Sequence, residues 1–189
     1  MAQAELKEAV TENDVTLSHQ QYLTFMLGGE TFAIGILAIK EIIEYGQLTE
    51  VPRMPDFIRG VINLRGAVVP VIDLKARFSN RLTEVARRTC IVIIEVQSGD
   101  DETQDIGILV DAVNEVLEIP QPDIEPPPSF GAAIESRFIN GMGKVNDKFV
   151  IILDIAHILM IDEISQLAAD HTESVSPLAN NEGSDESSD

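Results

Sequence analysis

The stretch that decides the fold is residues 57–74, FIRGVINLRGAVVPVIDL, which aligns without gaps with residues 138–155, FINGMGKVNDKFVIILDI. Phe, Ile, Gly, Val and Asp recur at matching places, at 57/138, 58/139, 60/141, 69/150 and 73/154. Upstream, the run AIKEIIE at 38–44 matches AVNEVLE at 112–118. We interpret these matches as an internal repeat whose unit is about 65 residues long.

Short β-branched runs separated by Gly, Pro and Asp indicate that each unit is built from small strands. These runs predict strands at residues 22–27, 31–36, 67–72, 90–96, 106–110 and 149–153. Residues 22–27 and 90–95 take the equivalent first-strand places. Two copies of one short-strand unit predict a mostly β protein made of two similar small β-barrels packed side by side.

Two short helices are expected, one after each copy of the repeat. Residues 74–78 can form one or two turns, and residues 155–169 have the spacing of an amphipathic helix. Asp73 and Asp154 end equivalent strands just before these helices. Paired carboxylates can serve acid–base chemistry, but helix capping accounts for both at less cost.

Composition and charge limit the classes of function. The chain has 189 residues, of which 44% are hydrophobic, and a mean hydropathy of +0.09, which favours a folded globular protein. No apolar run approaches the ~20 residues that span a bilayer. The net charge of -19 disfavours binding to nucleic acid and adhesion to anionic membranes. With one cysteine and no secretory signal pattern, the cytoplasm is the expected compartment.

The ends of the chain differ from its middle. Residues 1–18 are polar and predict a flexible N-terminal arm, residues 19–164 the folded domain, and residues 165–189 a helix end followed by a disordered acidic tail. An acidic insertion at 98–105, SGDDETQD, is expected to form a long loop in the second copy.

No catalytic or metal-binding motif is visible. There is no Gly-rich phosphate loop, nucleophile elbow or Cys-x-x-Cys motif, and His19, His157 and His171 are scattered. Cys90 opens an apolar run and is expected to be a packed small hydrophobe. We therefore expect no enzyme activity, no metal and no cofactor.

The segment NLRG at 63–66 stands out inside the first copy. Gly60 and Gly66 would allow tight turns that a Cβ would hinder. Strand alternation would put Asn63 and Arg65 on one side and Leu64 on the other. An arginine in apolar surroundings must extend to solvent or find a carboxylate.

The run VPRMPDFIRGVINLRGAVVPVIDL at 51–74 closely resembles the hallmark of the CheW family of coupling proteins. The flanking runs ILAIKEI at 36–42, GILVDAV at 107–113 and IEPPP at 124–128 agree with the same family. The resemblance covers about residues 20–165. It implies two five-stranded barrels of the Src-homology-3 kind, which agrees with the repeat, and a non-enzymatic scaffold that joins a CheA-type histidine kinase to methyl-accepting chemotaxis receptors in signalling arrays.

The resemblance also implies where partners bind. The receptor tip would lie in the groove between the barrels, with Ile39, Glu41, Ile42, Arg65 and Cys90 as contributors, while Gly60, Asn63, Leu64 and Gly66 form the structural motif. It places the segments of Glu41 and Arg65 close together, so these two charges should interact. The kinase would bind mainly on the outer strands of either barrel. The protein would be cytoplasmic, recruited to membrane-associated arrays without inserting into the membrane.

Other functions stay open beside this one. The chain could serve a related pilus or surface-sensing pathway, or be a small-molecule-binding β-barrel, although barrels this small are usually filled by their own side chains. An adaptor of the CheV type would need a phospho-receiver domain, and only about 25 residues follow position 164, too few for a domain. An enzyme would need a converging polar site.

Overall fold

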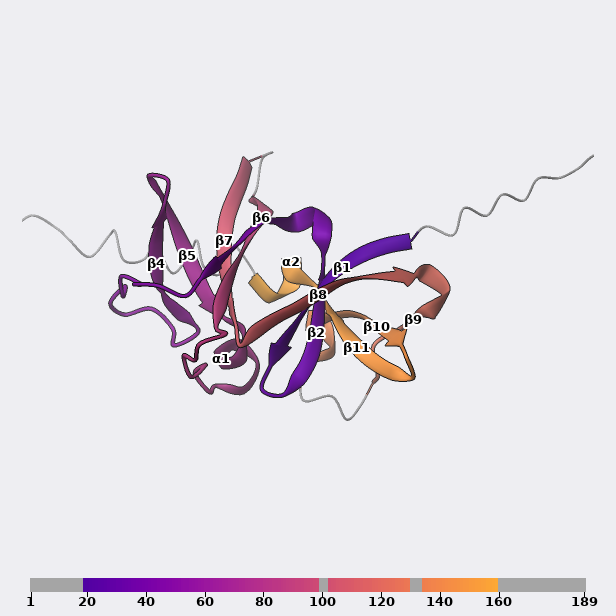
Figure 1. The fold of residues 1–189 in the computed structure, drawn as a ribbon. Helices are drawn as coiled ribbons and strands as arrows, with labels where there is room; N and C mark the ends of the chain where they lie inside the picture. Colours follow the sequence, from indigo (N-terminus) through magenta and orange to yellow (C-terminus); the bar gives the residue numbers. More distant parts are fainter. Residues whose placement is uncertain (1–18, 99–101, 130–133, 160–189) are drawn as a thin grey trace, which may run out of the picture.

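Strands make up most of the residues that the computed structural model describes, which are 19–98, 102–129 and 134–159 (Figure 1). Sheet A has the order β8 (Ala112–Pro120), β1 (His19–Leu27), β2 (Glu30–Gly35), β11 (Lys148–Leu153), β10 (Ile139–Val145) and β9 (Ile124–Glu125). Sheet B has the order β3 (Ile39–Glu44), β6 (Cys90–Ser98), β7 (Glu102–Val110), β5 (Ala67–Asp73) and β4 (Ile58–Leu64). All six predicted strands are present, so the mostly β fold with two similar sheets is confirmed.

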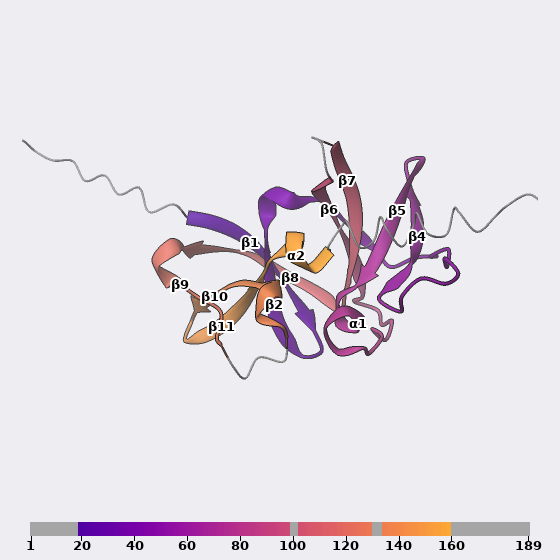
Figure 2. The same ribbon diagram turned by 180° about the vertical axis from the view of Figure 1, so that it is seen from behind.

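Short helices follow several of these strands. The α-helices are α1 (Leu74–Ser79) and α2 (Ile155–Leu159), and the 3-10 helices are η1 (Ile36–Ala38), η2 (Gln121–Asp123) and η3 (Ser136–Phe138). Residues 160–169 of the predicted amphipathic helix lie outside the described residues, as do the predicted arm at 1–18 and the tail at 165–189. Figure 2 shows α1 and α2 from behind, with α2 between the two halves of the molecule.

The two copies of the repeat exchange strands. In the first copy β1 to β5 follow one another, and in the second copy β6, β7, β8, β10 and β11 take the same places. Sheet A nevertheless combines β1 and β2 with β8, β10 and β11, whereas sheet B combines β6 and β7 with β3, β4 and β5. The parallel pairs β2–β11 and β7–β5 correspond in the same way. Each barrel therefore contains strands of both copies, which corrects the expectation of one barrel per copy.

The exchange also corrects the register of the first strands. Leu23 pairs with Val116 of β8, and Val92 pairs with the equivalent Ile42 of β3. Residues 22–27 therefore correspond to residues 91–96, and the expected match with residues 90–95 is wrong by one position. In a strand, one position moves every side chain to the opposite face.

Each sheet curls back on itself through the segment that follows its first edge strand. In sheet A, β9 continues from β8 after η2 and pairs with β10, so the sixth strand is the end of this connection. In sheet B, Thr49 exchanges two backbone hydrogen bonds with Val61, of 2.9 and 2.8 Å. Each sheet thus has five main strands and a short closing pair, consistent with the expected small-barrel fold.

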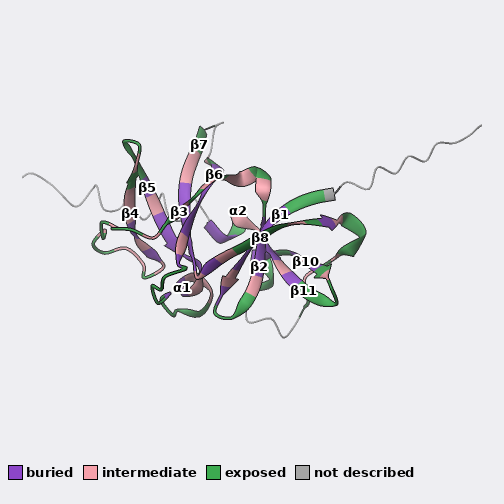
Figure 3. Ribbon diagram, viewed as in Figure 1, coloured by how far each residue is buried: buried purple, intermediate pink, exposed green. Residues whose placement is uncertain are grey.

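Both faces of the central strands are buried, which explains their unbroken apolar runs. Five buried residues on one face of sheet B fill the interior of its barrel: Val69, Val71, Ile91, Ile93 and Leu109. Five others fill the interior of the barrel of sheet A: Tyr22, Ala33, Ile119, Val150 and Ile152. The opposite faces meet in a larger cluster between the sheets, which includes Phe25, Ile94, Ile108 and Phe138. Figure 3 shows buried residues along these central strands.

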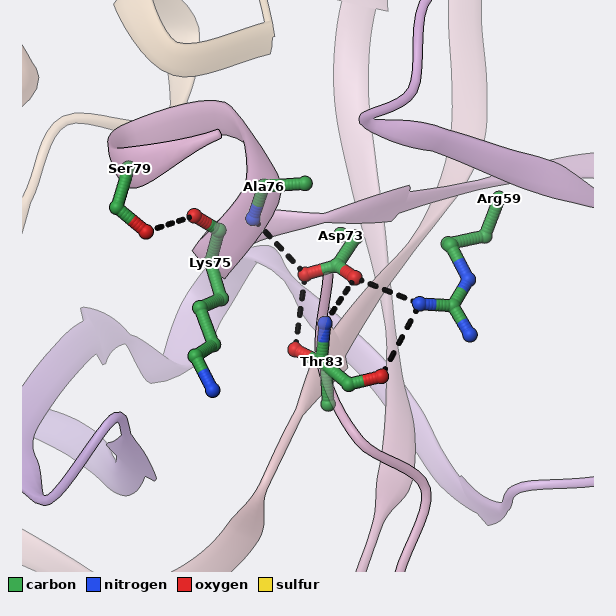
Figure 4. A network of polar contacts seen from close by, with 6 residues as sticks. All are labelled: Arg59, Asp73, Lys75, Ala76, Ser79 and Thr83. Atoms are coloured by element: carbon green, nitrogen blue, oxygen red, sulfur yellow. Dashed lines mark hydrogen bonds and ion pairs between the residues drawn. The ribbon is translucent and has the colours of Figure 1, made fainter. Parts of the chain in front are cut away.

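The predicted capping aspartates both cap helices. The Ala76 N–H donates to Asp73 Oδ1 at 3.1 Å, and the His157 N–H donates to Asp154 Oδ1 at 3.2 Å. Asp73 is fully buried, and it also accepts from the Thr83 N–H, the Thr83 hydroxyl and Arg59 (Figure 4). It therefore fixes the loop after α1 as well as the helix.

The NLRG segment forms a two-residue hairpin turn between β4 and β5. Arg65 and Gly66 have φ values of 51° and 89°, as a type I′ turn requires, and the Asn63 side chain accepts from the Gly66 N–H at 2.8 Å. Arg65 is thus a turn residue, not the strand residue that alternation predicted. The equivalent Asn146 and Asp147 have φ values of 49° and 61° at the other hairpin.

Gly60 lies in a bulged part of β4 rather than in a turn, which corrects its predicted role. Its φ is 146°, and a Cβ there would overlap the Thr49 carbonyl, which closes sheet B. Gly60→Ala should therefore lower the free energy of unfolding by about 3 kcal/mol, because backbone strain adds to the overlap. Chemical denaturation measures this change.

The matched control is Gly141→Ala, at the equivalent place in β10. A Cβ there meets the Ile124 side chain at 2.6 Å, which can move aside, and the Glu125 carbonyl at 3.1 Å, a milder contact than the overlap with the Thr49 carbonyl at position 60. We expect a clearly smaller loss. Equal losses would show that the closing bridge of sheet B adds nothing to the requirement for glycine at position 60.

The acidic insertion at 98–105 is mostly strand. Ser98 pairs with Glu102 and Glu95 with Asp105, so residues 102–105 extend the β6–β7 hairpin. Lys40 of β3 bonds Asp105 at 2.8 Å and Glu95 at 3.0 Å, and the hydrogen bond to Asp105 is the main cause that raises the pKa of Lys40. The expected long loop is therefore wrong, because β3 and β6 hold the acidic residues in place.

Candidate functional site

The five residues proposed for the groove lie on two faces of sheet B. Ile39 and Ile42 of β3 pair with Ile94 and Val92, which belong to the cluster between the sheets. Glu41 pairs with Ile93, whose side chain fills the barrel of sheet B. Cross-strand partners share a face. Ile39, Ile42 and Cys90 therefore lie towards sheet A, and Glu41 on the opposite face with its partner Arg65.

A β-bulge brings Ile39 and Ile42 to the same face. Residues three apart in a regular strand point to opposite sides, but the register between β3 and β6 shifts between Ile39 and Glu41. The inserted residue restores the apolar side chains to one face. Ile39 packs at the margin of the inter-sheet cluster, while Ile42 keeps 44% of its surface exposed.

Strand β8 of sheet A repeats this arrangement. Val113 and Val116 pair with Phe25 and Leu23 across an equivalent register shift. Val113 packs at the margin of the same cluster, and Val116 is 45% exposed. We call Ile39, Ile42, Cys90, Val113 and Val116 the apolar strip.

Sequence reasoning missed Val113 and Val116, although the repeat contained the signal. The match of residues 38–44 with 112–118 aligns Ile39 with Val113 and Ile42 with Val116. From that alignment, the receptor contact predicted for β3 could also have been predicted for β8.

Cys90 joins the two halves of the apolar strip. It lies next to β3 through its pairing with Glu44, it packs at the margin of the inter-sheet cluster, and it is close enough to β8 to bond the backbone of Val113. Burial raises the pKa of the Cys90 thiol, while the Val113 backbone and the charge of Arg88 act in the opposite direction. The thiol is therefore protonated at neutral pH and presents a small, uncharged surface.

Glu41 and Arg65 form the expected interaction, which is confirmed as a two-pronged ion pair. Arg65 donates to Glu41 Oε1 at 2.6 Å and to Oε2 at 3.0 Å. The hydrogen bond to Glu41 raises the pKa of Arg65 further above its ordinary value. The pair was expected to cross neighbouring strands, and this part is wrong. Glu41 lies on β3 and Arg65 in the turn after β4, and β3 and β4 are the two edges of sheet B, so the pair joins opposite edges of one barrel. Because the pair is exposed, it contributes little to stability, and its main effect is to fix the shape of this surface.

In the described part of the protein, hollows lie on the surface, whereas side chains fill the interiors of the barrels. A hollow of about 530 Å³ lies beside η1 and the start of α2, lined by Leu37, Glu118, Asn140 and Asp154 among others. Side-chain clusters fill both barrel interiors. In the described part of the chain, no group of three His, Cys, Asp or Glu side chains could hold a metal ion. None of the described helices is long and apolar enough to cross a membrane.

These features define a class of protein: two small barrels, each built from strands of both copies, that present a partly exposed apolar strip and no converging polar site in the described residues. The chain belongs to the family of the CheW-like domain, whose model matches residues 21–163.

Named relatives agree with this assignment. The chain is 34% identical over 146 residues to the chemotaxis protein CheW of Klebsiella aerogenes, covering 77% of this chain and 85% of the relative. It is 34% identical over 142 residues to the chemotaxis protein CheW of Helicobacter pylori, covering 75% and 82%. It also resembles the crystal structure of the scaffolding protein TtCheW from Thermoanaerobacter tengcongensis, with a TM-score of 0.67, 35% identity, and coverage of 74% and 87%.

Proposed function

We propose that this protein is a non-enzymatic scaffold that couples a CheA-type histidine kinase to methyl-accepting chemotaxis receptors. The family comprises adaptor proteins, and one solved relative is described as a scaffolding protein. The apolar strip is the observation that carries the proposal, because it is a contact surface without chemistry of its own. The scaffold would act in the cytoplasm and be recruited to membrane-associated receptor arrays.

The apolar strip is the proposed receptor surface. Ile42 and Val116 lie on the edge strands of different sheets, and Cys90 and Val113 connect them beside the buried cluster. A narrow apolar strip suits the apolar face of a helical hairpin, as at a receptor tip. The Glu41–Arg65 pair lies on the opposite face of β3. It would hold this edge strand in place and would not contact the part of the receptor that binds the apolar strip.

The two β-hairpins provide the proposed kinase surface. Val68 of β5 and Phe149 of β11 occupy equivalent places in the repeat, and they are 72% and 50% exposed. Their neighbours Val69 and Val150 point into the barrels, so Val68 and Phe149 point outwards. β5 and β11 each have a paired strand on both sides, so these positions are not on the outer strands that were expected. Exposed apolar side chains that point away from the barrel interiors nevertheless suit contact with a related barrel of the kinase. Separate receptor and kinase surfaces would let both partners bind at once.

Substitutions on the two surfaces should separate the two binding activities. Ile42→Asp should weaken binding to a receptor fragment at least about tenfold, since a buried charge costs more than 1.4 kcal/mol, and should leave kinase binding unchanged. Phe149→Asp is the matched control and should do the reverse. Calorimetry with each partner, together with thermal melts, measures both effects.

Two outcomes would contradict the assignment. Equal loss of both bindings with a lowered melting temperature would make Ile42 a structural residue. Full receptor binding by a folded Ile42→Asp variant would move the receptor surface away from the apolar strip.

A further inference from the structure

The basic residues of this acidic chain are concentrated in one segment. Residues 53–88 hold eight of the chain's 13 basic residues and three acidic ones, so they carry a local net charge of +5 in a protein of -19. Five of these basic residues lie in α1 and the loop that follows it. One of them, Arg77, bonds the Ile158 carbonyl. We call the other four the basic surface: Lys75, Arg81, Arg87 and Arg88. The coupling role described above does not use them.

The structure holds the basic surface in place without neutralising it. Asp73 bonds both the start of α1 and Thr83, so the loop that carries Arg81 is tied down (Figure 4). Among the described residues, no hydrogen bond or ion pair engages the side-chain charges of the basic surface. Leu82 and Val85, between these charges, are 52% and 49% exposed. The loop thus presents positive charge and apolar area together.

A hollow lies at one end of the basic surface. It has a volume of about 390 Å³, and it is lined by Lys75 and Arg81, by apolar side chains that include Phe78 and Leu27, and by one acid, Glu30. An apolar floor with positive charge at the rim suits a segment that alternates acidic and apolar residues.

The described chain ends beside this surface. Ile158 and Leu159 are buried, and Arg77 of α1 donates to the Ile158 carbonyl at 3.3 Å. Residues 160–189 begin at this point and contain eight acidic residues with no Lys or Arg. Ten residues span about 15 Å as a helix, the form that the sequence predicts up to residue 169, and roughly 17 Å as a flexible chain. Both lengths exceed the roughly 9 Å length of α1. Asp170 and the acids after it can therefore reach the basic surface.

We infer that the acidic C-terminal segment, residues 165–189, docks on the basic surface of its own chain. Charge complementarity supplies the attraction, and the exit point beside α1 supplies the proximity. Tethering gives the segment an effective concentration on the order of mM. The segment therefore occupies the basic surface most of the time, even if the same interaction is weak between separate molecules. A partner that binds the basic surface must displace this segment first.

A spin label on the segment tests the docking. In the full chain, Cys90→Ala removes the native thiol and Ser184→Cys places a nitroxide among the acids of the segment. At low salt, the amide NMR signals of residues 74–88 should lose most of their intensity. In about 1 M NaCl, where the Debye length falls to ~3 Å, they should recover.

Charge reversals locate the contact. Arg87→Glu with Arg88→Glu should restore the lost signals at low salt. The matched control is Lys144→Glu with Lys148→Glu, which reverses two exposed charges at the β10–β11 hairpin and should leave the effect unchanged. Equal effects of the two double variants would overturn the inference, because the attraction would then depend only on net charge.

A second measurement needs no cysteine. Shortening the chain after residue 164 should shift amide signals mainly within residues 74–88. Shifts spread evenly over the protein, or none, would contradict docking there. In a mixture of spin-labelled chain with isotope-labelled chain that carries no spin label, signal loss at the basic surface would show docking on a second copy, which also overturns the inference.

Discussion

Cutting the chain between Arg87 and Arg88 should give two fragments that do not fold alone and that recover the native fold when mixed. Fragment 1–87 would contain β1 to β5, yet β1 and β2 pair with strands of the second copy. The Thr24 hydroxyl, for example, donates to the Glu115 carbonyl at 2.8 Å across 91 positions of the sequence. Alone, each fragment would expose the apolar faces of strands that have lost their partners.

Far-UV circular dichroism and thermal melts check this result. Each fragment at low concentration should lack a cooperative transition, and the equimolar mixture should regain one. A fragment that melts cooperatively as a monomer would contradict the exchange of strands. The expected effect is the largest here, because separate fragments lose two strand pairs in each sheet at once: β1–β8 and β2–β11 in sheet A, and β3–β6 and β5–β7 in sheet B.

Removing the carboxylate of Asp73 should have the largest effect of any single substitution discussed here. Asp73 is fully buried and forms an ion pair with Arg59 at 3.0 Å, besides its bonds to Ala76 and Thr83. Asp73→Ala leaves the Arg59 charge partly buried without its partner, and such breaks cost about 3–5 kcal/mol. For a domain of this size, we expect a decrease in melting temperature of roughly 10 °C or more.

The repeat supplies the matched control for this substitution. Asp154→Ala removes the equivalent cap, where Asp154 bonds the His157 N–H and the His157 ring near the surface. Loss of a helix cap alone costs about 1 kcal/mol. In calorimetric melts, Asp73→Ala should therefore lower the free energy of unfolding several times more than Asp154→Ala does. Similar losses would mean that the buried network around Asp73 contributes no more than its capping bond.

The sequence predicts the strands well and their partners poorly. Alternation and β-branched runs report burial along one strand, so the runs at 90–96 and 106–110 identify β6 and β7. They carry no information on which strand lies beside them. The repeat suggested one barrel per copy, and the exchange is visible in the strand pairings, such as β1 with β8 and β3 with β6.

Local backbone geometry accounts for the remaining errors. Alternation placed Arg65 in a strand, but positive φ at Arg65 and Gly66 makes a turn. The β-bulge in β3 moves Ile42 to the face of Ile39 and leaves Glu41 on the other, which no periodic pattern predicts. The Glu41–Arg65 pair was nevertheless predictable, because the family resemblance placed the segments of these two opposite charges close together.

The exchange of strands also has a consequence for synthesis of the protein. When β1 leaves the ribosome, its partner β8 still lies about 90 residues behind, a delay of roughly 5–20 s at ordinary translation rates. During this time, the apolar strands β1 and β2 can pair with each other but cannot complete sheet A. An unpaired apolar edge is prone to aggregation. The nascent N-terminal half therefore keeps this apolar edge unpaired until the second copy emerges.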